Sequence, residues 1–473
     1  MRHGTFGIWV RARVAPIFEM NQVGVENMVC DEDDIVAIAT PPGRGGVSII
    51  RLSGPHIPAF AHQFLGRLPK PRMATFAEFK DAQHHAIDHG LALYFPAPNS
   101  YTGEHVLELH GHGSPIAMQL LVKRCLEFGL RLARPGEFSE RAFLNGRLDL
   151  AQAEAVSDLI ESQTEAAAKS AFQSLKGRFS DRIEALVHKV TELRIYVEAA
   201  IDFPEEEIDF LADGDVQNRL DELLYDLASL LASVKQGQLL RDGLKVVLTG
   251  LPNAGKSSVL NALSNEQRAI VSAIAGTTRD VLEQVIQLDG LPIEILDTAG
   301  VRHAQDEIEA EGVRRAVAAQ RQADLILLVV DDSTEQDSQI SSLVETLPSG
   351  IPSILVRNKI DLSQREPGGN EHEVSVSALT GEGMEALKSR ILDNAGYRQS
   401  DDSRFIARAR HLDAINRAQD CLKKGRDQLV TYRAGELLAE DLLACQHALG
   451  EITGEVTSDD LLGLIFGSFC IGK

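Results

Sequence analysis

The stretch Gly250-Leu251-Pro252-Asn253-Ala254-Gly255-Lys256-Ser257 decides the fold of the central part of this 473-residue chain. It fits the pattern GxxxxGK[ST] and follows the strand-like run 245–249. Its glycines let backbone N–H groups curl around phosphates, Lys256 supplies a positive charge to the outer phosphates, and the Ser257 hydroxyl is a ligand for Mg²⁺. The stretch therefore predicts a P-loop between a strand and a helix.

Two further motifs follow strand-like runs downstream. Asp297-Thr298-Ala299-Gly300 places a carboxylate near the magnesium and a glycine amide near the terminal phosphate. In Asn358-Lys359-Ile360-Asp361, the Asp361 carboxylate can accept two hydrogen bonds from the ring and amino donors of guanine, a donor pair that adenine lacks. Ser377-Ala378 completes the base pocket. These motifs predict a GTPase and disfavour a P-loop ATPase.

The segment Gly276-Thr277-Thr278-Arg279-Asp280 supplies a second magnesium ligand, Thr278. Val301 follows the motif at 297–300, where Ras-like enzymes carry the glutamine that orients the attacking water. We therefore expect this domain to position its water in another way.

The spacing of apolar residues changes along the chain on both sides of the P-loop. Residues 244–395 alternate strand-like and helical segments, as in an α/β domain with a largely parallel sheet. Apolar residues recur at helical spacing through 149–200, 220–234, 412–429 and 435–449. Because helical stretches flank the α/β unit on both sides, we expect that unit to be inserted into one helical domain.

The N-terminal part has short apolar runs bounded by glycine and proline. The runs predict strands at 35–39, 48–52, 91–95 and 106–109, with helices at 58–65 and 115–128. This part is therefore expected to be an α+β domain. The fold class expected for the whole chain is multidomain: an N-terminal α+β domain, an all-α helical domain and an inserted α/β P-loop GTPase domain.

The expected domain boundaries follow from these changes. The N-terminal domain takes residues 30–146, the helical domain 147–240 and 399–473, and the GTPase domain 241–398. Residues 1–29 are expected to be an N-terminal tail or the result of a translation start assigned too early, with Met28 as the true first residue. Arginines among apolar residues leave a transit peptide as the alternative.

The formal net charge of −22 argues against a general basic surface for nucleic acid or anionic lipid. Residues 1–150 carry 15 basic and 15 acidic side chains, so the acidic excess lies behind the first third. No apolar run is long enough for a membrane span, and we expect no membrane association. Five scattered cysteines without metal-ligand spacing indicate a reducing, cytoplasmic location.

Histidines and one cysteine are the remaining candidates for chemistry. His84, His85, His89, His105, His110 and His112 lack a carboxylate or cysteine partner at metal-ligand spacing, which favours surface and core histidines over a metal site. Cys470, fourth from the end, fits a prenylation signal badly. It is either a buried cysteine beside a helix end or a thiol whose thiolate is favoured by Lys473.

Nearly the whole chain from about residue 35 resembles the MnmE (TrmE) family of bacterial and organellar tRNA modification GTPases. The resemblance rests on Thr40-Pro41-Pro42-Gly43-Arg44-Gly45-Gly46, residues 134–145, the P-loop, residues 276–280 and the terminal Phe469-Cys470-Ile471-Gly472-Lys473. It implies an N-terminal domain that binds 5-formyl- or 5,10-methylene-tetrahydrofolate and mediates homodimerisation.

The resemblance also assigns site residues. The folate site would comprise Arg51, Glu108, Arg147 and Lys473, and Arg147 departs from the lysine of the family pattern, which changes the donor geometry. Potassium would be held by Asn253, Ser272, Ile274 and Thr277, and Mg²⁺ by Ser257 and Thr278. Glu309 matches the family's water-positioning glutamate, which would answer the absence of glutamine at Val301, and Cys470 matches its terminal cysteine.

The motifs and the resemblance together give the expected nucleotide-binding positions. These are Asn253, Ala254, Gly255, Lys256, Ser257, Ser258, Ser272, Ala273, Ile274, Ala275, Gly276, Thr277, Thr278, Asp297, Thr298, Ala299, Gly300, Asn358, Lys359, Asp361, Ser377 and Ala378.

The implied function is a homodimeric, potassium- and magnesium-dependent GTPase. With MnmG, a flavin-dependent partner that carries FAD and joins it in a heterotetramer or larger complex, it would install an aminomethyl-type group on carbon five of the wobble uridine of tRNA, using a tetrahydrofolate one-carbon unit. The alternative is a regulatory or ribosome-assembly GTPase without one-carbon chemistry, which shares the GTPase motifs but leaves Arg51, Glu108 and the terminal segment unexplained.

Overall fold

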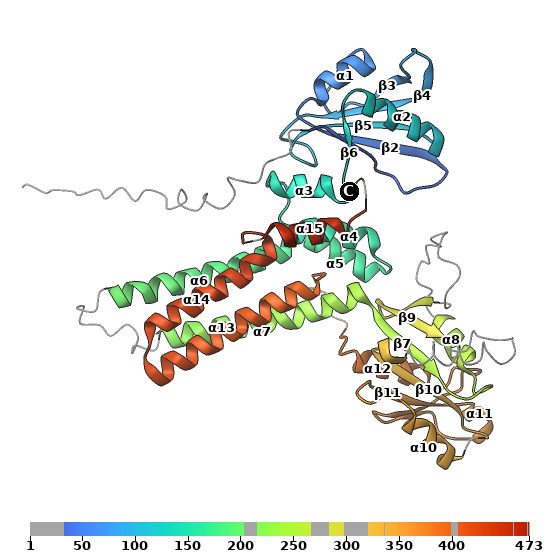
Figure 1. The fold of residues 1–473 in the computed structure, drawn as a ribbon. Coiled ribbons are helices and arrows are strands. Elements are labelled where there is room, and N and C mark those ends of the chain that lie inside the picture. The colour runs from blue at the N-terminus through green and yellow to red at the C-terminus, as the bar shows by residue number, and fades with distance from the viewer. Residues whose placement is uncertain are drawn as a thin grey trace, which may run out of the picture. The chain divides into compact units, whose positions relative to one another are not determined.

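The computed structural model describes residues 33–202, 215–265, 283–297, 320–334, 336–398, 405–456, 458–470 and 472. The chain divides into two compact units, which are described separately (Figure 1). The first contains Met1–Leu148 and Gly463–Lys473, and the second contains Asp149–Leu462. The domain boundaries expected from the sequence stay a prediction.

The first unit is built on a six-stranded sheet with strand order β3-β4-β5-β2-β1-β6. Its strands are β1 (Ile35–Ile38), β2 (Gly45–Gly54), β3 (Thr75–Lys80), β4 (Ala86–Phe95), β5 (His105–Gly113) and β6 (Arg131–Leu132). Its helices are α1 (Ile57–Leu65), α2 (Pro115–Glu127) and α3 (Glu137–Leu144). Every strand and helix expected in this part is present, and β3, β6 and α3 are additions.

The core of the first unit lies between one face of this sheet and helices α1 and α2. Alternate residues of the strands face it, including Ile50 and Leu52 of β2 and Leu107 and Leu109 of β5. The two helices add Phe60, Phe64, Met118 and Leu121 to the same cluster. The period of two in the strand sequences and the apolar stripe of each helix therefore meet in one core.

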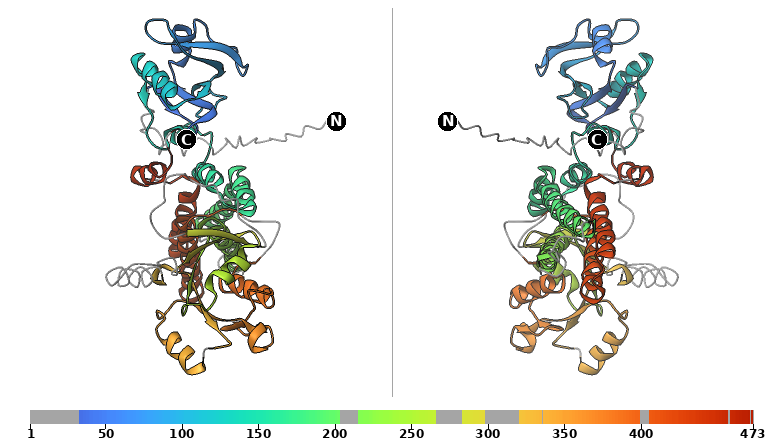
Figure 2. Two further views of the ribbon diagram at one scale, coloured as in Figure 1. Left: turned by 90° about the vertical axis from the view of Figure 1, so that its right-hand side faces the viewer. Right: turned by 90° about the vertical axis from the view of Figure 1, so that its left-hand side faces the viewer.

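The second unit contains a bundle of long helices. These are α4 (Leu150–Glu161), α5 (Glu165–Leu175), α6 (Arg178–Asp202), α7 (Asp215–Asp242), α13 (Ala409–Tyr432) and α14 (Gly435–Thr453), and α15 (Asp459–Gly467) follows (Figure 2). In α7, Leu220, Leu223, Leu227, Leu230 and Val234 are buried at spacings of three and four, which is the pattern of an amphipathic helix. Helices from both flanking stretches of sequence share this core.

The second unit also contains a seven-stranded sheet with strand order β12-β13-β11-β10-β7-β9-β8. Its strands are β7 (Leu244–Thr249), β8 (Glu283–Leu288), β9 (Leu291–Asp297), β10 (Leu325–Asp331), β11 (Ser353–Asn358), β12 (Gly368–Gly369) and β13 (Glu373–Ser375). Its helices are α8 (Lys256–Asn265), α10 (Asp337–Glu345), α11 (Ile360–Ser363) and α12 (Met384–Asn394). Only the β8–β9 and β12–β13 pairs among these described strands are antiparallel. The expected multidomain fold class is confirmed.

No helix in the described ranges is long and apolar enough to cross a membrane.

A buried ion cluster joins four helices of the second unit. Glu154 of α4 is 1% exposed and accepts hydrogen bonds from Arg410 Nε (2.8 Å) and Nη2 (2.7 Å) of α13. His411 Nε2 lies 2.9 Å from the same carboxylate. One turn along α4, Asp158 contacts Arg408 at 2.8 Å and Arg241 of α7 at 3.0 Å. Arg410 also donates to the carbonyl of Glu451 in α14.

Burial sets the protonation states in this cluster. Desolvation lowers the pKa of His411 below its usual value of 6.5, against the pull of the Glu154 carboxylate. Burial would raise the pKa of Glu154, but the hydrogen bond from His411 and the charge and hydrogen bonds of Arg410 outweigh it and hold that pKa below its usual range. At neutral pH the cluster therefore contains an ionised carboxylate beside an uncharged imidazole.

We expect His411→Gln to remove part of the acid sensitivity of the fold. A histidine with a lowered folded-state pKa takes up its proton more readily when unfolded, so its contribution to stability is present above pH 6.5 and is lost as the pH falls below that value. The slope is at most about 1.4 kcal/mol per pH unit. Glutamine keeps a donor for Glu154 but cannot be protonated.

Urea unfolding followed by circular dichroism at about pH 7.5 and 5.5 measures this effect. The unfolding free energy of the wild type should fall by roughly 1 kcal/mol more than that of His411→Gln between the two pH values. The control is His188→Gln, because the His188 side chain is 74% exposed and should leave the pH dependence of the wild type unchanged. Equal pH slopes for all three proteins would contradict the assignment.

Candidate functional site

The P-loop lies where the parallel strands of the second sheet end. Residues 250–255 connect β7 to α8, and the register pairs Leu248 of β7 with Asp297 of β9. On the other side of β7, Leu328 of β10 pairs with Thr249, and Asp331 of β10 pairs with Asn358 of β11. The carboxyl ends of four strands therefore bring the motifs at 250–257, 297 and 358–361 to one edge of the sheet, which is where open α/β sheets bind ligands.

Close backbone approaches explain two glycines of the loop. Gly250 has φ of 138°, and a Cβ there would lie 2.0 Å from the carbonyl oxygen of Val329. Gly255 has φ of 93°, and its Cβ would lie 2.2 Å from Asn358 Nδ2. A side chain at Gly250 would clash with the backbone of β10, and one at Gly255 would displace the Asn358 side chain. The Lys256 ammonium lies over the loop and donates to the carbonyls of Gly250 and Leu251, each at 2.9 Å.

The loop is tied to the segment that follows β11. Buried Asn358 donates from Nδ2 to the Ala254 carbonyl at 3.0 Å, and its Oδ1 accepts from the Ala378 amide at 3.1 Å. Lys359 donates to the Asn253 carbonyl at 2.9 Å. Asp331 accepts from Lys359 at 2.5 Å, and the charge of the lysine helps to hold the pKa of Asp331 below its usual range although burial opposes the shift. These contacts hold the two motifs at a fixed separation.

A cavity of about 420 Å³ opens beside these residues. Predicted nucleotide-binding residues line it, namely Gly255, Ser258, Asn358, Lys359, Asp361 and Ala378. Asp361 is exposed, and its Oδ1 accepts from the buried Ser377 hydroxyl at 2.6 Å, which orients the carboxylate. The volume is in the range of small-molecule sites.

Four further residues line this cavity and were not predicted from the sequence. They are Asn261, Ala262, Leu362 and Leu379. Leu362 and Leu379 are 65% and 85% exposed, which is unusual for leucine and suits contact with the flat faces of a base. Their position directly after Asp361 and Ala378 is the only sequence signal for them.

Several predicted residues lie outside the described part of the chain. They are residues 272–278, Thr298, Ala299, Gly300, Glu309 and Lys473. Asp297 is described only as the last residue of β9. Of the expected potassium ligands, Asn253 is described: it is exposed and has φ of 66°. Ser257 is the second residue of α8, at the positive end of that helix.

A second set of predicted residues lies in the first unit. Arg51 of β2 and Glu108 of β5 are direct cross-strand partners. Arg51 Nε and Nη2 both lie 3.0 Å from Glu108 Oε1, and His110 Nε2 lies 3.1 Å from Glu108 Oε2. The Arg51 guanidinium carbon lies 5.3 Å from the ring centre of Tyr101 and 5.8 Å from that of Phe138. Sheet register and two aromatic rings thus fix the guanidinium.

The terminal segment reaches the same guanidinium. Arg51 Nη1 lies 3.5 Å from the Gly472 carbonyl oxygen. Gly472 is buried with φ of 95°, and a Cβ there would lie 2.5 Å from the Ile38 carbonyl oxygen, so only glycine fits. The Gly136 amide donates to the Cys470 carbonyl at 3.4 Å, while Cys470 itself is exposed. The interpretation of Cys470 as a buried cysteine is therefore wrong.

Arg147 lies beside the loop that carries Tyr101. It is exposed, and its Cγ would be 3.3 Å from a Cβ on Gly103. The structure thus brings Arg51, Glu108 and the terminal segment together, while Arg147 lies against the loop that carries Tyr101. His110 and Tyr101 join them, and sequence reasoning did not assign either to the site. The cross-strand register that places His110 next to Glu108 cannot be seen in the sequence alone.

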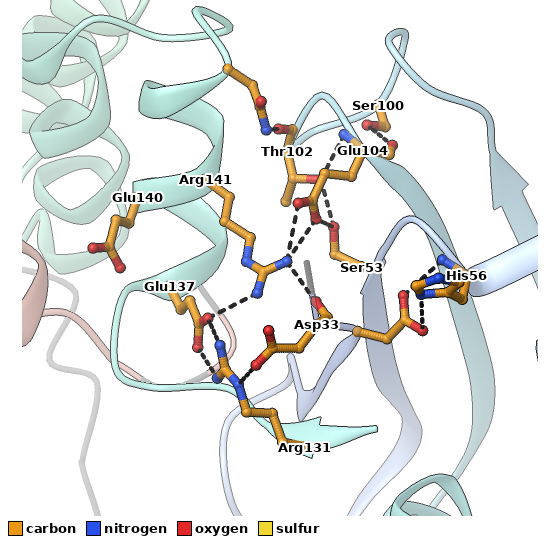
Figure 3. A network of polar contacts seen from close by, with 12 residues as sticks. Asp33, Ser53, His56, Ser100, Thr102, Glu104, Arg131, Glu137, Glu140 and Arg141 are labelled. Carbon is orange, nitrogen blue, oxygen red and sulfur yellow. Dashed lines mark hydrogen bonds and ion pairs between the residues drawn. The ribbon is translucent and has the colours of Figure 1, made fainter. Parts of the chain in front are cut away.

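A buried ionic network supports α3 beneath this site (Figure 3). Arg141, 6% exposed, donates to both Glu104 oxygens at 3.0 and 3.1 Å and to Glu137 at 3.1 Å. Glu137 also pairs with Arg131 at 2.6 Å, and Arg131 is the first partner that holds the pKa of Glu137 below its usual range against the effect of burial. Residues 137–144, within the segment 134–145 that carries part of the family resemblance, thus form a helix held by paired charges.

Comparisons with known proteins identify relatives of this chain. A family model described as the MnmE helical domain matches residues 150–470, and one described as the GTP-binding protein TrmE N-terminus matches residues 34–147. Curated relatives named tRNA modification GTPase MnmE, from Yersinia pseudotuberculosis serotype IB and Yersinia pestis bv. Antiqua, are each 54% identical over 450 residues, covering 93% of this chain and 99% of theirs.

Solved structures of other proteins match part of this chain. The G domain of the T. maritima FeoB iron transporter is 29% identical, with a TM-score of 0.25, and the match covers 32% of this chain and 98% of that one. Both family models together span nearly all of the described residues, and the curated relatives extend over almost their full length. The chain therefore belongs to the MnmE (TrmE) family of tRNA modification GTPases.

Proposed function

We propose that this chain hydrolyses GTP in a potassium-dependent reaction and uses the cycle to modify carbon five of the wobble uridine of tRNA. The carbon unit comes from 5-formyl- or 5,10-methylene-tetrahydrofolate, and a flavin-dependent partner, MnmG, carries FAD. The active species is a homodimer in the cytoplasm that assembles with the partner into a heterotetramer or larger complex. Two observations support this proposal: a cavity lies next to the P-loop, and in the arginine site of the first unit Arg51 contacts both Glu108 and the carbonyl of Gly472.

In the nucleotide site, different residues bind the phosphates, the guanine base, the magnesium ion and the attacking water. Backbone amides of the loop and the Lys256 ammonium hold the phosphates, while Asp361 accepts hydrogen bonds from guanine. Magnesium would be held by Ser257 and Thr278, and the strand end at Asp297 supplies a nearby carboxylate, as suits an ion that prefers oxygen ligands and phosphate. Glu309 orients the attacking water. The remaining predicted nucleotide-binding positions contact the nucleotide from the same loops.

A potassium ion held by Asn253, Ser272, Ile274 and Thr277 would add positive charge where the transferring phosphoryl group becomes more negative. The exposed position of Asn253 on the loop supports this, because its amide oxygen is a neutral ligand of the kind that large monovalent ions accept.

In the first unit, Arg51, Glu108, Arg147 and Lys473 bind the folate. Cys470 lies exposed next to this site, as a thiol must in order to reach a bound one-carbon unit. The rival proposal, a regulatory or ribosome-assembly GTPase, gives no role to this set of residues, so folate binding separates the two.

We expect Asp361→Asn to exchange guanine for xanthine specificity. The amide would present a donor to the ring and amino donors of guanine, so kcat/KM for GTP should fall by about 10²-fold or more, while xanthosine triphosphate, which carries an oxygen in place of the amino group, should gain. Asp393→Asn is the matched control, since Asp393 is 68% exposed in the same unit. An unchanged ratio of the two substrates would overturn the role of Asp361.

GTP hydrolysis measured in potassium and in sodium tests the cation site. We expect a rate at least about tenfold higher in K⁺, and Rb⁺, which is close to K⁺ in radius, should substitute for it because the stabilisation depends on an ion of matching size. Equal rates in potassium and sodium at the same ionic strength would exclude the site.

Arg51→Gln tests the folate site in the full-length chain. Loss of a charged donor should weaken 5-formyl-tetrahydrofolate binding by about tenfold or more in equilibrium dialysis, and Arg51→Lys should restore only part of it because the fork geometry is lost. Lys123→Gln, at an exposed position on α2, is the control. In a strain deleted for its own MnmE, wild-type chain should restore wobble-uridine modification and Arg51→Gln should not, while restoration by Arg51→Gln would favour the rival proposal.

A further inference from the structure

A stretch of the first unit carries only positive charge. From residue 35 to residue 77 there is no Asp or Glu, while Arg44, Arg51, Arg67, Lys70 and Arg72 lie within it. Arg67, Lys70 and Arg72 are concentrated in the loop 66–74 between α1 and β3, and all three are exposed. In a chain with a net charge of −22, this loop is a marked local reversal of sign.

The loop presents its cations on a fixed backbone. Pro69 is buried, and Pro71 forms an isolated bridge with Tyr94 of β4. The amide of Arg72, at φ of 59°, donates to the Tyr94 carbonyl at 2.8 Å, and the Met73 amide donates to the Lys70 carbonyl at 3.1 Å. Since proline also restricts its own φ, little backbone entropy remains to be lost when a ligand binds.

The charges of this loop are not neutralised by carboxylates. Within the described residues, Arg67 and Lys70 have no ion-pair partner, and Arg72 Nη2 donates to the neutral Asn99 carbonyl at 2.6 Å. Arginines elsewhere are tied to acids, as Arg141 is to Glu104 and Glu137. An unneutralised cation group attracts anions at short range even on an acidic protein.

The loop also lies beside the arginine site. Asn99, which accepts from Arg72, stands two residues before Tyr101, whose ring lies 5.3 Å from the Arg51 guanidinium carbon. The loop is therefore linked to the arginine site through the segment 99–101.

We propose that Arg67, Lys70 and Arg72 form a docking surface for the phosphate backbone of tRNA. This inference rests on the proposed function, in which tRNA is the substrate whose wobble base must reach the arginine site. Backbone phosphates are recognised by cations on a preformed surface, without base contacts. A protein partner is the weaker choice, because protein interfaces centre on buried aromatic and apolar anchors, and within this loop Met73 is the single large apolar side chain that is exposed.

The test measures binding of the full-length chain to an in vitro tRNA transcript with uridine at the wobble position, by fluorescence anisotropy over a range of KCl concentrations. The Arg67→Gln/Lys70→Gln variant is compared with Arg182→Gln/Lys235→Gln, which removes the same two charges from exposed positions on α6 and α7. We expect the loop variant to bind roughly tenfold or more weakly at about 0.1 M salt, and its log Kd against log salt slope to fall by about 2. The control variant should match the wild type, and thermal unfolding midpoints should agree among all three.

Each other outcome decides against the surface. Equal affinity and equal slope in the two variants would overturn it while leaving tRNA as the substrate. Normal tRNA binding by the loop variant, together with lost binding to the flavin-dependent partner, would also overturn it and assign the loop to a protein interface. No binding of the transcript by the wild-type chain would overturn both this surface and the proposed function on which it rests.

Discussion

The arrangement of the second unit depends on one buried carboxylate, that of Glu154. A charge removed from water must be fully paired, and removing one partner of such a pair costs about 3–5 kcal/mol. Glu154 meets this requirement with two hydrogen bonds from Arg410 and one contact with His411. The requirement fixes α13 against α4, although these helices are separated by the whole inserted domain in the sequence.

The same constraint extends toward the nucleotide site. Asp158, one turn from Glu154, pairs with Arg241 in the last turn of α7, and β7 begins at Leu244. On the other side, Thr164 donates to the Gly290 carbonyl at 2.8 Å, while the Tyr397 hydroxyl donates to the Asp289 carbonyl at 3.1 Å. These hydrogen bonds hold the turn between β8 and β9 in place, and β9 ends at Asp297. These contacts thus fix β7, the strand that leads into the P-loop. They also fix the turn before β9, the strand that leads to the motif at 297–300.

Local patterns in the sequence were enough to predict most helices, most strands and the P-loop. Burial on one face gives apolar residues a period of two in β2 and β5 and a spacing of three and four in α7. Each pattern can therefore be recognised in a short stretch of sequence. β3 was missed because Glu78 and Lys80 interrupt its apolar residues. α3 was missed because its buried positions include Glu137 and Arg141, whose burial depends on partners that the local sequence does not reveal.

In the candidate sites, too, local sequence patterns do not reveal contacts between residues that are far apart in the chain. Asn358 and Asp361 follow a strand in a recognisable pattern, but the Asn358–Ala254 hydrogen bond joins positions more than a hundred residues apart. The Arg51–Glu108 pair depends on strand register, and the approach of Gly472 to Ile38 brings the end of the chain to its first strand. Those contacts arise only from tertiary structure, and residue patterns did not predict them; the resemblance to a family grouped Arg51 with Glu108 but named none of the other contacts.

The acidic balance of the chain limits how it can bind anions. With carboxylates in excess, most buried arginines are paired, as in the clusters around Glu154 and Glu137, and their charge is unavailable to a ligand. Positive potential for an anion must come from elsewhere. In the P-loop it comes from backbone amides and Lys256 at the start of α8, and these can close around one triphosphate. In the loop 66–74 it comes from side chains on a proline-fixed backbone, which are spread along a surface and therefore suit an extended chain of phosphates.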